Sequence, residues 1–383
     1  MFLALRDLRF ATGRFALMGS VVALISLLLV MLSGLTAGLG GQNTAAIDRL
    51  GEQGVQRLVF GGAAGQEPTA SFTQSEFTVA QRDAWAATDG VASVEPLGVS
   101  QGRAIGLEHP VDTDPQGRAD VSGEPTTGVA TTAFIGLTPG GSDAPAGVEP
   151  GQIVLSQDVA DSLHAQAGDA VAVSGFVYTV ADVVPTEYYS HSPVTWLALE
   201  DWNAISHTAD DAVLGTAGLV RFDAGADVDA VADAGDDAAG TVAETVKGSY
   251  AALPSYRSEN GSLMTMQGFL YGISALVVIA FLSIWTVQRT RDIAVLKALG
   301  GSNGWVLKDS LAQAAFVLVG GVAVGTGLAA VIGAFAGRAV PFELSWATTA
   351  VPAAGVLVLG MLAAVVAVFR VTRIDPLVAL GGN

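Results

Sequence analysis

The chain contains no cysteine among its 383 residues. It can therefore form no disulfide, no thiolate metal site and no cysteine nucleophile. Basic side chains are also few: 18 Lys and Arg stand against 36 Asp and Glu, and the formal net charge is −18. Such an acidic balance argues against binding nucleic acid, whose phosphates attract basic surfaces.

Sequence motifs for catalysis are missing as well. No Gly-x-x-x-x-Gly-Lys-Ser/Thr stretch occurs, so the chain brings no Walker-type nucleotide site of its own. Ser156 and Ser192 have no recognisable triad context, and the histidines are not spaced as metal ligands: His109, His164, His191 and His207. The sequence thus predicts neither an enzyme nor a metal site.

Four long runs without a charged residue set the class of protein. They extend over Phe15–Gly38, Gly261–Val287, Leu311–Gly337 and Leu344–Phe369. At about 1.5 Å per residue each can cross the roughly 30 Å hydrocarbon layer as a helix. We predict transmembrane helices at 15–39, 261–287, 311–337 and 344–369. A cleaved signal peptide is the alternative for the first run, but the run exceeds the roughly 7–15 residues of a signal core.

The distribution of charge predicts the orientation. Nine of the 18 basic residues lie in segments 1–14, 288–310 and 370–383, with only four acidic residues beside them. These segments are predicted to be cytoplasmic by the positive-inside tendency, with 1–14 as an interfacial helix. Segment 40–260 carries 31 acidic and 8 basic residues, a net charge of −23, and is the predicted extracellular domain. Segment 338–343 is then a short external loop in a plasma-membrane protein.

The external segment alternates strand and helix patterns. Strands are predicted at Val55–Phe60, Gly128–Leu137 and Tyr188–Leu199. Between them, a strand at Ile153–Leu155, a helix opened by Ser156, a turn at Gly168 and a hairpin through Gly175 form one unit. The fold class expected is an α-helical membrane protein with four transmembrane helices plus a large external α+β domain. The aspartates between Asp227 and Asp237 lack the spacing of a calcium loop and fit an exposed helix face.

The cytoplasmic loop QRTRDIAVLKALGGSNGWVLKDS, from Gln288 to Ser310, has a pattern of its own. Ile293, Leu296 and Leu299 recur on one helical face, and Gly300 can end that helix. The pattern predicts a stiff lever between two membrane helices. An ordinary basic loop is the alternative on spacing alone. Because the spans lack the acids, bases and histidines of ion-driven carriers, energy would have to come from a partner.

This loop resembles the coupling segment of FtsX/MacB-type permeases, with Gly301 where Ala is frequent. The tail RVTRIDPLVALGG resembles the C-terminal signature of that family, and VLSQDVADSLHAQAGDAVAVSGFVYTVADVV is similar to part of its MacB-like periplasmic core domain. The resemblance implies a type VII ABC exporter permease that works as a homodimer by mechanotransmission. Two copies of a separate ATPase would bind ATP and Mg and contact Arg289, Arg291, Asp292, Ile293, Leu296, Lys297, Leu299 and Gly300. The alternative is an FtsX-like signalling protein that controls an envelope enzyme without transporting a ligand.

The N-terminal stretch resembles haem-exporter permeases of the HrtB type, which implies haem as a substrate entering from the membrane. Methionine and tyrosine can ligate haem iron, and aromatic rings can stack on the macrocycle. The candidates are Met31, Tyr256, Glu259, Met264, Met266 and Tyr271, although packing and interfacial anchoring explain the same residue types. Gly34-xxx-Gly38 permits close helix packing, and by family analogy we place it at the dimer contact; packing within one chain is the alternative.

Overall fold

The computed structural model describes residues 12–63, 65–206, 212–288 and 303–372. The chain forms two compact units, which are described separately below. The membrane unit combines Met1–Leu39 with Asn260–Asn383, and the α+β unit is Gly40–Glu259. Most of the predicted cytoplasmic N-terminal segment, most of the coupling loop and most of the tail lie outside the described residues.

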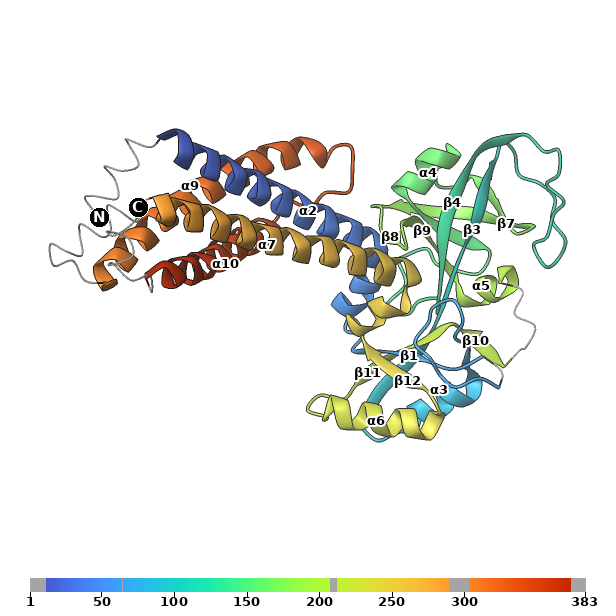
Figure 1. The fold of residues 1–383 in the computed structure, drawn as a ribbon. Coiled ribbons are helices and arrows are strands. Elements are labelled where there is room, and N and C mark those ends of the chain that lie inside the picture. Colours follow the sequence, from blue (N-terminus) through green and yellow to red (C-terminus); the bar gives the residue numbers. More distant parts are fainter. Residues whose placement is uncertain (1–11, 64, 207–211, 289–302, 373–383) are drawn as a thin grey trace, which may run out of the picture. The chain divides into compact units, whose positions relative to one another are not determined.

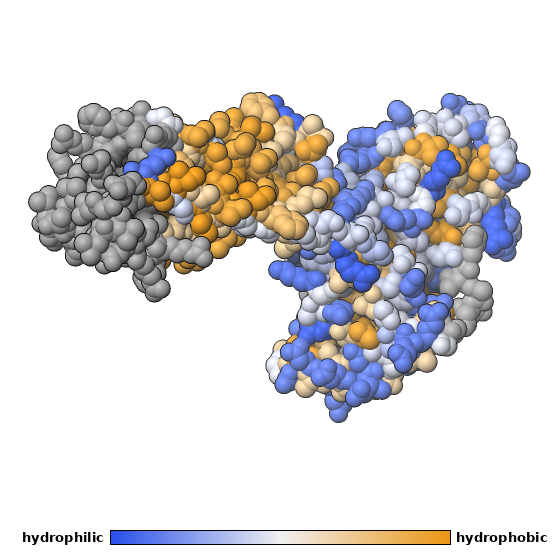
Figure 2. Space-filling view, viewed as in Figure 1, coloured by the Kyte–Doolittle hydropathy of each residue, from blue (hydrophilic) through white to orange (hydrophobic). Residues whose placement is uncertain are grey.

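Four long helices build the membrane unit: α2 (Thr12–Glu52), α7 (Pro254–Gln288), α9 (Asn303–Ala336) and α10 (Trp346–Thr372) (Figure 1). Each contains a stretch that is long and apolar enough to cross a membrane. Figure 2 shows the apolar residues gathered over these helices. The prediction of four membrane-spanning helices is confirmed. The helices satisfy their own backbone hydrogen bonds, which is the condition for crossing hydrocarbon.

Helix α2 extends well beyond the apolar run that predicted it. The last part of α2, after Leu39, belongs to the α+β unit and buries Ala46, Ile47 and Leu50 in the core of that unit. This spacing places the three side chains on one helical face. Burial of that face explains why the helix continues to Glu52 after the charge-free run ends.

Inside the membrane unit, small residues bring helices together. The core packs Val22 and Leu29 of α2 against Leu318 of α9 and their apolar neighbours. A Cβ atom added at Gly325 of α9 would lie 2.1 Å from the backbone oxygen of Ala23. A side chain therefore cannot be added there without moving the helices apart.

The α+β unit contains a ten-stranded sheet and a two-stranded sheet within the described residues. The strands are β1 (Arg57–Phe60), β2 (Phe77–Thr78), β3 (Val91–Leu107), β4 (Thr126–Leu137), β5 (Gln152–Ser156), β6 (Ala170–Val173), β7 (Phe176–Val184), β8 (Tyr188–Tyr189), β9 (Ser192–Ala198), β10 (Val213–Gly215), β11 (Ala217–Phe222) and β12 (Val242–Thr245). The order is β12-β1-β11-β3-β4-β9-β5-β7-β6, and β3 also pairs with β6. Strands β3, β4, β9, β5, β7 and β6 thus close into a ring, which leaves fewer free edges.

The helices of this unit are α3 (Val79–Ala86), α4 (Gln157–Leu163), α5 (Leu199–Ile205) and α6 (Val228–Ala239), with the 3-10 turn η1 (Gly248–Ala252). The predicted strand, helix and hairpin around Ser156 are present as β5, α4, β6 and β7. The α+β class is confirmed. The predicted strand at 188–199 is instead a hairpin, because Ser190 and His191 both have positive φ, 48° and 64°. Two such residues form the tight turn that joins antiparallel strands.

The longest strand was not predicted. Strand β3 carries Gly98 and Gly102, which normally indicate loops. In the folded unit, a Cβ atom added at Gly98 or at Gly136 of β4 would lie 2.2 or 2.4 Å from the Trp202 side chain. The two glycines on adjacent strands therefore create the recess that Trp202 fills.

Candidate functional site

The membrane unit contains an open apolar pocket of about 560 Å³. The lining residues are Leu28, Met31, Leu32, Leu35, Met266, Phe269, Leu270, Ala336, Val340 and Phe342. They come from α2, from α7, and from the end of α9 with the segment that follows it. Its volume falls in the range of about 300–1,000 Å³ typical of small-molecule sites. The pocket can therefore hold an apolar ligand of intermediate size.

One wall of the pocket depends on glycines. A Cβ atom added at Gly34 would lie 2.3 Å from Cζ of Phe342, and one at Gly38 would lie 2.2 Å from the Pro341 backbone oxygen. The Glu343 N–H donates to the Gly34 carbonyl at 3.0 Å. The segment after α9 thus lies directly on α2 and places Phe342 in the pocket wall. These contacts of Gly34 and Gly38 are made within one chain; their predicted role in a dimer contact stays a prediction.

The structure brings two predicted substrate residues together. Met31 of α2 and Met266 of α7 line the same pocket. Beside them, the Gln267 side-chain amide donates to the Thr36 hydroxyl at 3.2 Å and links the two helices. Sequence reasoning missed Phe342, which lies in a connection without helical periodicity. No local pattern could have indicated its position in the pocket wall.

Two other candidates of the membrane unit lie outside this pocket. Met264 is 60% exposed on α7. Tyr271 packs against α10, where a Cβ atom added at Gly355 would lie 2.8 Å from the tyrosine ring. Their positions fit lipid contact and helix packing more directly than a shared ligand site.

The remaining two candidates belong to the α+β unit. Tyr256 stacks edge-on against Tyr250, with ring centroids 5.4 Å apart. The Tyr250 hydroxyl donates to Asp48, and burial together with this carboxylate raises the pKa of Tyr250 above its ordinary value. Tyr256 therefore contributes to a packed polar corner of the unit.

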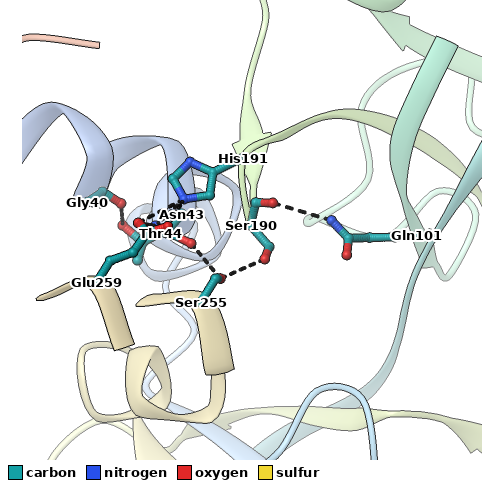
Figure 3. Close-up of polar contacts among 8 residues, drawn as sticks. All are labelled: Gly40, Asn43, Thr44, Gln101, Ser190, His191, Ser255 and Glu259. Atoms are coloured by element: carbon teal, nitrogen blue, oxygen red, sulfur yellow. Dashed lines mark hydrogen bonds and ion pairs between the residues drawn. The ribbon is translucent and has the colours of Figure 1, made fainter. Parts of the chain in front are cut away.

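Glu259 lies at the centre of a polar group that Figure 3 shows in detail. His191 Nε2 lies 3.0 Å from Oε1 and 2.9 Å from Oε2 of Glu259. Asn43 Nδ2 donates to Oε2 of the same carboxylate at 3.2 Å. The imidazole and carboxylate side chains remain 30% and 39% exposed. We call Asn43, Ser190, His191, Ser255 and Glu259 the hairpin cluster.

The backbone of the β8–β9 turn fixes this cluster in place. The N–H groups of Ser190 and His191 donate to the carbonyls of Asn43 and Gln42 at 3.0 and 2.9 Å. The Ser190 hydroxyl lies 2.8 Å from that of Ser255, which donates to Asn43 Oδ1 at 2.8 Å. The turn is thus tied to α2 and α7 at once (Figure 3). Sequence reasoning identified Glu259 alone, because its partners are more than 60 residues away.

The eight predicted ATPase-coupling residues, Arg289 to Gly300, lie outside the described residues. The family comparison covers this stretch. The model of the family described as FtsX-like permease C-terminal matches residues 264–376. These residues form an FtsX-like permease domain. The matched part contains most of α7, the coupling loop, α9 and α10, so it includes the loop and the first part of the tail, up to Pro376.

Two staphylococcal relatives extend the comparison. Each bears the name hemin transport system permease protein HrtB. The one from Staphylococcus epidermidis is 22% identical over 387 residues, which cover 100% of both chains. The one from Staphylococcus haemolyticus is 29% identical over 130 residues, which cover 34% of this chain and 37% of that protein. The family resemblance predicted from the sequence is confirmed over the full length of the chain.

Among solved structures, the periplasmic region of MacB from Actinobacillus actinomycetemcomitans is similar to part of this chain. The likeness covers 50% of this chain and 89% of that one, with 10% identity and a TM-score of 0.33. The α+β assignment itself rests on the strands and helices described above. Residues 264–376 thus match the FtsX-like permease family, and the full-length relative bears the name of a permease protein.

Proposed function

We propose that this permease is the membrane subunit of an ATP-driven exporter that moves haem out of the membrane. It would work as a homodimer with two copies of a separate ATPase, which binds ATP and Mg. The observation that carries the proposal is the open apolar pocket lined by Met31 and Met266. The full-length relative from Staphylococcus epidermidis, which is named for hemin transport, supports the choice of haem as substrate.

The chemistry of the pocket suits a planar amphipathic molecule. Apolar walls can cover the porphyrin faces, and the rings of Phe269 and Phe342 can stack on them. The thioether sulfur of Met31 or Met266 can ligate haem iron as an axial ligand. The pocket therefore combines hydrophobic burial with a possible bond to the metal of the substrate.

Orientation and energy supply complete the proposal. With the basic segments on the cytoplasmic side, both termini are cytoplasmic and the α+β unit is extracellular. In the sequence, the pocket residues of α2 come shortly before the α+β unit and those of α7 come shortly after it. This proximity favours a position of the pocket in the outer leaflet. The loop from Arg289 to Gly300 would dock on the ATPase. Closure of the two ATPase subunits would then move the attached helices.

Reconstitution of the permease with its ATPase in lipid nanodiscs tests the proposal. Hemin should stimulate ATP hydrolysis, and the double variant M31A/M266A should raise the half-maximal hemin concentration about tenfold, equivalent to about 1.4 kcal/mol. Met264→Ala, outside the pocket, is the matched control and should behave as wild type. An equal shift in both variants would contradict the assignment of the pocket.

Charge reversal in the coupling loop tests the energy supply separately. Arg291→Glu with Lys297→Glu should reduce hemin-stimulated hydrolysis about tenfold or more, because the docking surface for the ATPase loses its complementary charge. Arg338→Glu, on the predicted external loop, provides a control of the same chemistry. A complex that ignores hemin but retains an external protein partner would favour the signalling alternative.

A further inference from the structure

The hairpin cluster joins three elements that are distant in sequence. Asn43 lies on α2, Ser190 and His191 form the β8–β9 turn, and Ser255 and Glu259 lie on α7. All contacts among them are polar, and the central pair is about one-third exposed. Each polar contact at such exposure contributes little net stability, because water can replace the lost partner. They can therefore open and close without disrupting the fold.

The apolar contacts of the same helix behave differently. Ala46, Ile47 and Leu50 of α2 are buried in the core of the α+β unit. Breaking these contacts would expose apolar surface, which is unfavourable in proportion to the exposed area. The α+β unit thus holds α2 permanently at its core and reversibly at the hairpin cluster.

The hydrogen bonds of His191 also admit two arrangements. Its Nε2 lies 3.0 Å from Asn43 Nδ2, a donor, and 2.9 Å from Glu259 Oε2, an acceptor. A ring nitrogen either carries a hydrogen or accepts one. In one state Nε2 of His191 donates to Glu259, and in the other it accepts from Asn43, so these two contacts of His191 compete.

The turn leads directly into a central strand. Strand β9 pairs with β4 on one side and with β5 on the other, and its side chains from Val194 to Ala198 are buried. Gln101 of β3 holds the same turn through its side-chain amide, 3.0 Å from the Ser192 hydroxyl. A displacement of the turn would therefore be transmitted to the ring of strands.

We propose that His191, Glu259 and Asn43 form a reversible latch that couples α2 and α7 to strand β9 during the transport cycle. They act as positioning residues, because they orient these elements and contact no substrate in this role. The inference rests on the proposed function, which supplies the ATP-driven cycle. Release of the latch accompanies one stage of that cycle, and its closure accompanies another.

A disulfide across the latch tests whether it must open. The hydroxyls of Ser190 and Ser255 lie 2.8 Å apart, and the natural chain has no cysteine. S190C/S255C therefore introduces a single pair at a suitable separation. In the nanodisc complex, oxidation should reduce both basal and hemin-stimulated hydrolysis about tenfold, and dithiothreitol should restore them.

The matched control is T132C/T195C, whose hydroxyls lie 2.9 Å apart on neighbouring strands β4 and β9. A bond there stays within the sheet and should leave hydrolysis unchanged. Equal hydrolysis by oxidised and reduced S190C/S255C would overturn the latch, since it would show that the contact is static.

Hydrogen exchange on the permease alone separates this inference from the proposed function. Glu259→Ala should speed exchange of the Ser190 and His191 amides about tenfold, because the closed turn loses a partner. Arg257 is an exposed residue near Glu259 on α7, and Arg257→Ala should leave the exchange of these two amides unchanged. Unchanged exchange in the Glu259 variant would refute the latch whatever the substrate. Faster exchange, together with a wild-type complex that ignores hemin, would refute the haem proposal alone.

Discussion

At the scale of single residues, the glycines of α2 illustrate how a missing side chain determines a contact. Gly34 and Gly38 allow Phe342 and Pro341 to lie against the helix, and the pocket wall follows from that approach. The Gly-xxx-Gly spacing was visible in the sequence. Its partner was not, because the spacing indicates only that some backbone or side chain comes close.

Substitution of Gly38 should destabilise the membrane unit. In Gly38→Ala the new methyl group collides with the Pro341 backbone, and overpacking of this kind costs about 1–3 kcal/mol. Gly327→Ala on α9 is the control, since a Cβ atom there meets nothing within 4 Å. The midpoint of thermal unfolding in detergent should fall for the first variant and stay unchanged or rise for the second. An equal midpoint in both variants would contradict this prediction, because it would show that segment 338–345 can move away from the new methyl group at little cost.

At the scale of elements, α6 shows why an acidic run need not bind a cation. Asp227 caps the helix by accepting from the Ala230 N–H at 3.3 Å. Asp236 accepts from the Thr241 hydroxyl and the Ala243 N–H, both at 2.7 Å. The run therefore supplies the start and the end of a helix whose other face buries Ala232 and Gly235, with Gly235 beside the Trp85 side chain of α3. The sequence predicted an exposed helix face for these aspartates, but it did not predict that Asp227 and Asp236 also stabilise the two ends of the helix.

Asp236 also predicts a dependence of stability on pH. Burial raises the pKa of this carboxyl above its usual range, outweighing its two hydrogen bonds. A group with a raised folded-state pKa stabilises the fold below its unfolded pKa, and that contribution is lost as pH rises through the folded pKa. From about pH 4 upward, wild type should therefore lose a contribution that Asp236→Asn does not lose.

Urea unfolding of the full chain at several pH values measures this difference. The exposed Asp223→Asn, before the same helix and not among the charges that act on Asp236, serves as the control and should keep the pH dependence of wild type. A parallel pH profile for Asp236→Asn and wild type would contradict the assigned effect of burial.

At the scale of the whole molecule, the charge distribution predicts which segments face the cytoplasm. The cysteine-free background makes the orientation measurable with single cysteines. Ser122→Cys, in the acidic segment, should react with a membrane-impermeant maleimide in intact cells. Ser302→Cys, in the basic loop, should react only after permeabilisation. The unsubstituted chain is the unlabelled control, and labelling of Ser302→Cys in intact cells would reverse the proposed orientation.

The sequence by itself determined the class of this protein. Hydropathy and charge act along the chain, so four apolar runs and their basic flanks suffice to predict membrane helices, and local motifs sufficed to indicate the FtsX-type permease. Only the tertiary structure decided the sites. Met31, Met266 and Phe342, like Asn43, His191 and Glu259, become neighbours through packing of distant segments. No periodicity within one segment records which side chain of another segment will fill the space beside it.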